Sequence, residues 1–230
     1  MSLLGFYQKV ESVTADITLN IETTIASVPA AENAVNTITL PAAGRRVGKE
    51  IYVFNQSLFA QKVAGASGDS VFGQSLVLPN QFIRYDSDGS DWYCLNPPGM
   101  QAVINVSLSA ANIIAMNATP ISLIPAQGAG RVVLVQSYTI QIVRTATAFT
   151  GGGAVEVRYT NGSGAKAGAD ISSSFVTGAE GTAYVSIAGV VTELKPVVNA
   201  AIVITNATAG FAAGTGTAKV RLQCTFADFN

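Results

Sequence analysis

The feature that most constrains this chain is the regular recurrence of turn residues between short stretches of alternating apolar and polar residues. Turn signals arrive about every eight to twelve residues, which is the spacing of a β-sandwich or barrel. DITLNIETTIASV, residues 16–28, reads as one strand, because apolar side chains recur there at every second position. EIYVFNQS, residues 50–57, reads as another strand. The sequence therefore predicts an all-β fold.

The best domain boundary in the chain is NPPGM, residues 96–100, where two stiff prolines precede a flexible glycine. We expect a linker at 97–100 between a small N-terminal β-sandwich or barrel, residues 13–96, and a larger C-terminal jelly-roll-like sandwich, residues 101–230. In the second part, SLSAANIIAMN is the only clear helical turn, with Ser107 or Ser109 as its cap. RVVLVQSYTIQIV should be a central strand, and SSSFV, residues 172–176, is expected to be a further strand.

Charged residues make up only 12% of the chain, and residues 100–130 and 196–218 carry none. Typical soluble domains have roughly 25% charged residues. We expect that part of the surface is hidden against other subunits; the alternative is a β-rich monomer with a Thr/Ser/Asn surface. The net charge of −1 offers no basic field for nucleic acid, and the uncharged stretches are too polar for a membrane span.

The sequence contains no histidine, which removes the commonest general base and the commonest metal ligand. No G-x-S-x-G elbow occurs, and Cys94 and Cys224 form no metal or redox motif, so buried free thiols are expected. Glu156 and Asp170 show no arrangement that the sequence can establish as a catalytic pair. We therefore expect no enzyme activity, no cofactor and no bound metal.

DSDGSDWYCL, residues 86–95, is the nearest approach to a metal-binding motif. A helix-loop-helix calcium loop needs glycine at its sixth position and glutamate at its twelfth, but here Gly89 is fourth and Pro97 is twelfth. FIRYD and DWYCL read instead as two strands joined by an Asp-Gly turn. The sequence favours the corner of a hairpin over a calcium site.

The first dozen residues, 1–12, precede the first alternating stretch and carry apolar side chains with nothing local to bury them. We expect an arm that docks on a neighbouring subunit or on another protein; the alternative is an N-terminal strand of the same domain. The contact residues expected in this arm are Leu3, Leu4, Phe6 and Tyr7.

Two stretches resemble modules of tailed-bacteriophage structural proteins. Residues 36–96 resemble a small β-domain that is widespread in these particles, with matching positions in the same order: Leu40-Pro41, Gly48-Lys49, Asp69, Gly73, Asp88-Gly89 and Trp92-Tyr93. Residues 107–162 resemble a domain common in phage virion proteins, through a helix, Thr-Pro, a Pro-x-x-Gly-x-Gly turn and a Gly-Gly-Gly-x-x-x-x-Arg-Tyr signature.

The resemblance implies a protein of the virion, made in the host cytoplasm, of the capsid decoration (cement) or head-fibre type. Proteins of this type commonly form trimers. The expected partners are copies of the chain itself and the major capsid protein, with the N-terminal domain facing the shell. The alternative is a tail-tip or fibre protein that binds a host surface glycan, which exposed Phe149 and Tyr184 side chains would favour.

Overall fold

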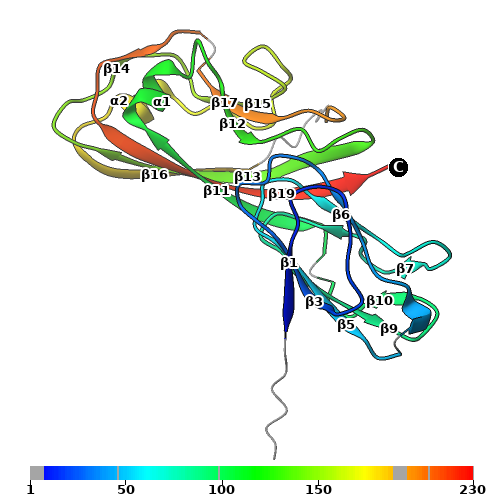
Figure 1. The fold of residues 1–230 in the computed structure, drawn as a ribbon. Coiled ribbons are helices and arrows are strands. Elements are labelled where there is room, and N and C mark those ends of the chain that lie inside the picture. Colours follow the sequence, from blue (N-terminus) through cyan, green and yellow to red (C-terminus); the bar gives the residue numbers. More distant parts are fainter. Residues whose placement is uncertain (1–7, 46, 98, 189–195, 207, 230) are drawn as a thin grey trace, which may run out of the picture. The chain divides into compact units, whose positions relative to one another are not determined.

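The computed structural model describes residues 8–45, 47–97, 99–188, 196–206 and 208–229. The chain forms two compact units, residues 1–100 and residues 101–230, each of which is described here by itself. The described residues of both units lie mainly in strands, and those of the second unit also form two short α-helices (Figure 1). The predicted all-β fold is confirmed. None of the helices in the described part of the chain has the length and apolar character to cross a membrane.

The first unit is built from two sheets. The six-stranded sheet has the order β1-β3-β5-β9-β10-β7. Its strands are β1 (Lys9–Ser12), β3 (Thr23–Val28), β5 (Glu50–Asn55), β7 (Val71–Phe72), β9 (Phe82–Ser87) and β10 (Trp92–Cys94). The four-stranded sheet has the order β2-β4-β6-β8. Its strands are β2 (Ile17–Thr18), β4 (Thr37–Thr39), β6 (Gln61–Ala64) and β8 (Leu76–Val77), and a short 3-10 helix, Ala43–Arg45, lies between β4 and β5.

The first six strands alternate between the two sheets, and their neighbours within each sheet are parallel. β1 pairs with β3 and β3 with β5 in one sheet, while β2 pairs with β4 and β4 with β6 in the other. Parallel strands need a crossover between them, and here each crossover contains a strand of the opposite sheet. The chain therefore winds in coils that add one strand to each sheet.

Residues 16–28 do not form the single strand that their alternation predicts. The chain turns at Asn20, whose carbonyl accepts from Thr23 N (2.9 Å) and whose Oδ1 accepts from Glu22 N (3.0 Å). β2 and β3 therefore belong to different sheets. Period-two alternation continues through the turn, and so it does not reveal the change of sheet.

The core of the first unit lies between its two sheets. Ile51, Val53 and Ile83 from the larger sheet are fully buried, as are Ile38 of β4 and Val77 of β8. Full burial of each such side chain stabilises the fold by about 1.5–3 kcal/mol. Because alternate residues of a strand face opposite sides of the sheet, the burial of Ile51, Val53 and Ile83 makes the residues between them on β5 and β9 face outward.

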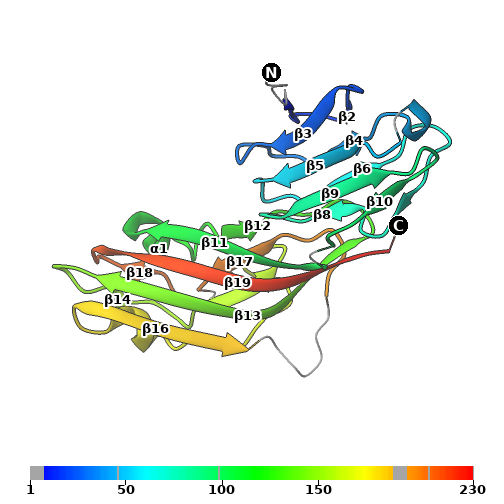
Figure 2. The same cartoon turned by 90° about the horizontal axis from the view of Figure 1, so that it is seen from below.

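The second unit is a sandwich-like pair of sheets, with strand orders β11-β19-β13-β16 and β12-β17-β15 (Figure 2). The first sheet contains β11 (Gln101–Ser109), β13 (Arg131–Arg144), β16 (Gly181–Ala188) and β19 (Gly216–Asp228). The second contains β12 (Ile121–Ile124), β15 (Glu156–Tyr159) and β17 (Ile202–Thr205), and β14 (Thr150–Gly151) pairs separately with β18 (Phe211–Ala212). Between β11 and β19 the strands of these two sheets alternate along the chain.

The two helices differ in how well the sequence predicts them. α1 (Ala110–Ala115) begins at Ser109, which forms a capping box with Asn112. α2 (Ser173–Thr177) occupies most of SSSFV, so the strand predicted there is wrong. Ser172 accepts a hydrogen bond from Ser174 N at the start of α2, and this local serine cap competes with the extended conformation.

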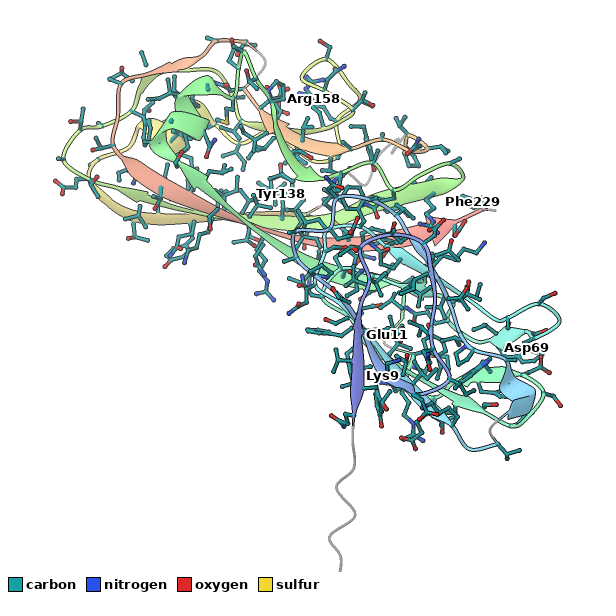
Figure 3. The ribbon with its side chains drawn as sticks, viewed as in Figure 1. Lys9, Glu11, Asp69, Tyr138, Arg158 and Phe229 are labelled. Atoms are coloured by element: carbon teal, nitrogen blue, oxygen red, sulfur yellow. The ribbon has the colours of Figure 1, made fainter. Side chains whose placement is uncertain are left out.

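Two buried tyrosine side chains of the second unit donate hydrogen bonds to backbone carbonyls far from them in the sequence. Tyr159 of β15 is fully buried, and its hydroxyl donates to the Val133 carbonyl of β13 (2.9 Å). Tyr138 of β13 (Figure 3) points into the sandwich and donates to the Ala169 carbonyl. A buried hydroxyl without a partner costs free energy, so the Tyr159 bond helps to define how the two sheets pack and the Tyr138 bond holds the segment between β15 and α2 against β13.

Candidate interaction surface

The outward face of the six-stranded sheet is the strongest candidate site in the first unit. On β5 the buried residues Ile51 and Val53 alternate with half-buried Tyr52 and Phe54, which point away from the core. On β9 the same alternation turns Phe82 outward. The face is therefore aromatic where a solvent-facing sheet surface is usually polar.

Two aromatic groups lie on this face. Phe82 stacks on Tyr52, with ring centroids 5.2 Å apart, and meets Phe54 edge-on at 6.2 Å. Phe72 of β7 stacks on Tyr93 of β10, also at 5.2 Å. Phe72, Phe82 and Tyr93 are 48%, 46% and 37% exposed, so much of their ring surface remains in contact with water. We name this surface, formed by Tyr52, Phe54, Phe72, Phe82 and Tyr93, the aromatic face.

A charged cluster lies beside these rings. Arg84 forms a bidentate pair with Asp86, through Nε–Oδ1 at 2.7 Å and Nη2–Oδ2 at 2.6 Å, and its Nη2 lies 3.3 Å from Glu50 Oε1. The hydrogen bond to Asp86 raises the pKa of the Arg84 guanidinium. Tyr52 donates its hydroxyl to Glu50 (2.9 Å), which raises the pKa of Tyr52. The face therefore has fixed charges of both signs next to exposed rings.

The aspartate-rich segment forms a hairpin corner, as the sequence predicts. β9 and β10 pair antiparallel, and Gly89 has a φ of 98°, which favours glycine. Asp88 Oδ1 accepts from the backbone N–H groups of Ser90 and Asp91 (both 2.8 Å). These two bonds lower the pKa of Asp88, and the bond from Asp91 has the larger effect.

The carboxylates of this corner are directed to different partners. Asp86 is paired with Arg84, while Asp91 Oδ1 accepts from Ser70 N (2.7 Å). Within the described ranges, no three residues of the types that bind metals come together. The segment builds the end of the sheet on which Tyr93 is displayed.

Several positions that carry the phage resemblance meet at this end of the first unit. The Trp92 indole donates to the Pro41 carbonyl (3.0 Å), and Asp69 Oδ2 accepts from Ala43 N (2.7 Å). A side chain at Gly89 would come within 2.7 Å of Val47 Cγ2. These positions therefore perform a structural task, which is to close the sandwich around Trp92.

The sequence-derived contact residues Leu3, Leu4, Phe6 and Tyr7 lie outside the described residues. The last part of the expected arm, Lys9–Ser12, forms β1 at the edge of the six-stranded sheet (Figure 3). Val10 pairs in register with Ile25, which pairs with Tyr52. Val10 is 58% exposed, so the edge strand adds an apolar side chain next to the aromatic face.

Sequence reasoning missed three members of the aromatic face, Phe54, Phe72 and Phe82. A signal was present for Phe54, because EIYVFN places two aromatic residues, Tyr52 and Phe54, on the same side of one strand, opposite Ile51 and Val53. The sequence does not show that these rings are neighbours, because β5, β9, β10 and β7 come together only in the sheet. Of the two aromatic residues whose exposure would favour a glycan-binding protein, Phe149 is buried and Tyr184 is 67% exposed.

A second cluster of charges lies in the other unit. Glu156 alternates in the sequence with the apolar residues Val155 and Val157, yet its side chain is buried, with Arg158 Nε as a direct partner. Lys166 Nζ lies 3.3 Å from Glu156 and 2.7 Å from Asp170. The hydrogen bond to Asp170 raises the pKa of Lys166. Cations thus neutralise both carboxylates, and the cluster holds the 160–170 segment over the sheet.

The two cysteines are free. Cys224 lies in the core, where burial raises its pKa to about 12, and half-buried Cys94 also has a raised pKa because of burial. Both thiols are held in the protonated, unreactive form.

Comparisons of the chain with protein-family models, with curated proteins and with solved structures find no match.

Proposed function

We propose that this chain is a structural component of a tailed-phage virion, a decoration (cement) protein that binds the assembled head as a homotrimer. The resemblance of residues 36–96 and 107–162 to phage virion modules suggests the kind of particle. The observation that carries the proposal is the aromatic face of the first unit. The proposed role is structural rather than catalytic.

The composition of the aromatic face is that of a protein–protein interface. Tyr, Phe and Arg are enriched in the buried centres of interfaces, and they supply most of the binding energy there. Phe72 and Phe82 are each about half exposed, so complete burial against a partner would contribute about 1 kcal/mol for each ring. Exposed rings that already stack on a neighbour also lose little side-chain freedom on binding.

The charged cluster would provide orientation more than affinity. Arg84 is already paired with Asp86 and Glu50, so a partner would meet a charge pattern that is locally balanced. Complementary charges at an interface select the correct partner and register, and like charges reject others. We expect the capsid surface that covers this face to place polar groups opposite Arg84 and apolar groups opposite the rings.

The arm proposed at residues 1–12 would extend this contact. β1 ends the six-stranded sheet, and its exposed Val10 continues the apolar surface of the neighbouring strands. In the proposal, Leu3, Leu4, Phe6 and Tyr7 insert between neighbouring capsid subunits. Deleting residues 2–7 leaves β1 intact, so a loss of head binding in that variant would come from the arm and not from the sheet.

The mechanism of such a protein is thermodynamic. Binding only the assembled shell stabilises that state by mass action, by about 2.7 kcal/mol per site when the free protein is at one hundred times its Kd. A trimer that engages three neighbouring sites gains further avidity, because the second and third contacts form at high effective concentration.

Immunogold labelling of intact virions with an antibody against residues 100–230 tests the proposal directly. Label distributed over the head is the expected result, followed by a lower heat stability of heads that lack the protein. Label confined to the tail would overturn the decoration role and would favour the alternative of a host-binding tail protein.

A further inference from the structure

The outward face of β11, β19, β13 and β16 differs in chemistry from the aromatic face. Its side chains lie in rows across the four strands, because the strands pair in register: Ser107 with Lys219, Lys219 with Gln141, and Gln141 with Tyr184. The next row contains Asn105, Arg221, Thr139 and Ser186. Figure 2 shows these four strands side by side. We name this surface the polar face.

Neutral hydrogen-bonding side chains dominate the polar face. The outward rows are those that begin on β11 at Val103, Asn105, Ser107 and Ser109. Their aliphatic residues are Val103, Val143 and Ala188, and their charged residues are Lys219 and Arg221. All other residues in these rows are neutral and polar. These rows contain no aspartate or glutamate. The face therefore presents positive charge that no carboxylate of its own rows balances.

Lys219 and Arg221 are also unusual among the cations of the second unit. Arg131, Arg158 and Lys166 each form an ion pair, and buried Arg144 donates to the Phe175 and Ala179 carbonyls. In the part of the chain that the structure describes, Lys219 and Arg221 have neither an ion pair nor a side-chain hydrogen bond.

The polar face is hollowed at Arg221. The hollow has a volume of about 170 Å³ and is lined by Ser137, Thr139, Ser186, Arg221 and Gln223. Two hydrogen bonds frame it, from Ser137 Oγ to Gln223 Oε1 (2.8 Å) and between Thr139 Oγ1 and Ser186 Oγ (3.0 Å). The hollow is smaller than pockets that enclose drug-sized ligands, so a ligand would lie on the sheet with one group in the hollow.

We propose that the polar face binds an acidic saccharide, with a sugar carboxylate on the Arg221 guanidinium. A guanidinium can hold a carboxylate through two parallel N–H···O bonds. The hydroxyls of Ser137, Thr139 and Ser186 offer partners to the hydroxyls of the same sugar. This inference goes beyond the decoration role and stands independently of it.

Tyr184 supports a saccharide as the occupant. Its ring is 67% exposed, and Gln141 Nε2 fixes the ring by donating to its hydroxyl (2.8 Å). A fixed, exposed ring in the row next to Arg221 gives the apolar face of a second sugar a surface on which to stack.

Other polyanions and proteins fit the polar face less well. Nucleic-acid binding typically uses six to ten phosphate contacts, whereas this face offers two cations. Protein interfaces bury apolar or aromatic centres and are depleted in serine and lysine, but here the only aromatic side chain in the rows defined above is Tyr184.

An array of uronic-acid and sialic-acid oligosaccharides, each beside its carboxyl-reduced counterpart, tests the inference with the full chain. We expect binding to acidic members, at least tenfold weaker binding to their reduced counterparts, and at least tenfold weaker binding by R221Q. K62Q is the matched control, because Lys62 is an exposed cation of the other unit with no described ion pair, and it should bind as the wild type does.

Three results would overturn the inference: no binding to any acidic member, equal binding to the reduced members, or wild-type binding by R221Q. Tetraglutamate, added in solution as a competitor of the arrayed acidic saccharides, provides a further test. If it competes as strongly as the free acidic sugar does, the face recognises any chain of carboxylates, and the saccharide assignment is wrong. The R221Q variant leaves the aromatic face unchanged, so its binding to heads distinguishes a failure here from a failure of the decoration role.

Discussion

The indole nitrogen of Trp92 donates a hydrogen bond to the carbonyl oxygen of Pro41, 3.0 Å away and 51 positions earlier in the chain. Both groups are buried, and the bond joins the hairpin of β9 and β10 to the connection that follows β4. Because an indole N–H in the core needs an acceptor, this bond and the packing of the ring define one arrangement of the first unit.

W92F should therefore lower the free energy of unfolding of the first unit by about 2–4 kcal/mol. The change removes the donor, leaves the Pro41 carbonyl without its partner and creates a cavity. Urea denaturation followed by circular dichroism measures this. Y93F is the control on the exposed side of the same strand and should change stability little. Equal stability of W92F and the wild type would show that the bond contributes nothing.

Alkaline pH should destabilise the second unit from about pH 9 upward. Burial raises the pKa of Cys224 to about 12 from its ordinary value of 9.0, so the unfolded state loses this proton first. The contribution of the protonated Cys224 thiol to the free energy of unfolding is complete below pH 9. It falls as the pH rises towards 12, by up to about 1.4 kcal/mol per pH unit. Tyr159, whose pKa burial raises to about 12, adds to this loss above pH 10.

C224A provides the measurement of the thiol contribution. Denaturation at pH 8, 9 and 10 should give a flatter dependence for C224A than for the wild type, whatever the absolute cost of the smaller side chain. Parallel curves for the two proteins would contradict the assignment to Cys224.

E156Q should destabilise the second unit by about 2–3 kcal/mol. It leaves the Arg158 guanidinium, which is only partly exposed, without a carboxylate partner. Loss of one partner from a fully buried pair costs about 3–5 kcal/mol, and we expect less here because the Lys166 side chain reaches solvent. D170N removes the exposed partner of Lys166 and should cost less than about 1 kcal/mol. Equal effects in thermal unfolding would contradict this view of the cluster.

F82S should weaken binding to phage heads at least tenfold while costing the isolated protein less than about 1.5 kcal/mol. Phe82 is 46% exposed, and its main local contacts are the stack on Tyr52 and the edge-on contact with Phe54. Cosedimentation with purified heads measures the binding. Y184S, which removes an exposed ring of the second unit, should bind heads normally. A similar loss in both variants would show that exposed aromatics act without regard to position.

Local chemistry made some parts of this structure predictable. The Asp88-Gly89 corner and the Ser109 cap each depend on a few neighbouring residues, so their sequences indicate them directly. The strand at 131–144 was recognisable as central because apolar residues occupy both parities of its first half. SSSFV was misassigned because a single serine cap decides between a helix and a strand in so short a segment.

The two candidate surfaces depend on pairing between distant residues. Arg221 lies beside Thr139 and Ser186 only because β13 separates β19 from β16, and Phe82 meets Phe54 only through the pairing of β5 with β9. Alternation of apolar and polar residues indicates which residues share one side of a strand, but it does not predict which other strand pairs with that strand.

The sequence by itself determined the all-β class, the hairpin corner and the capped helix, because period-two alternation, turn residues and caps act over a few positions. Only the tertiary structure decided the parallel winding of the first six strands, the burial of Glu156 and the membership of both surfaces. These features follow from pairing and packing between segments far apart in the chain, where the burial of whole sheet faces outweighs any local preference.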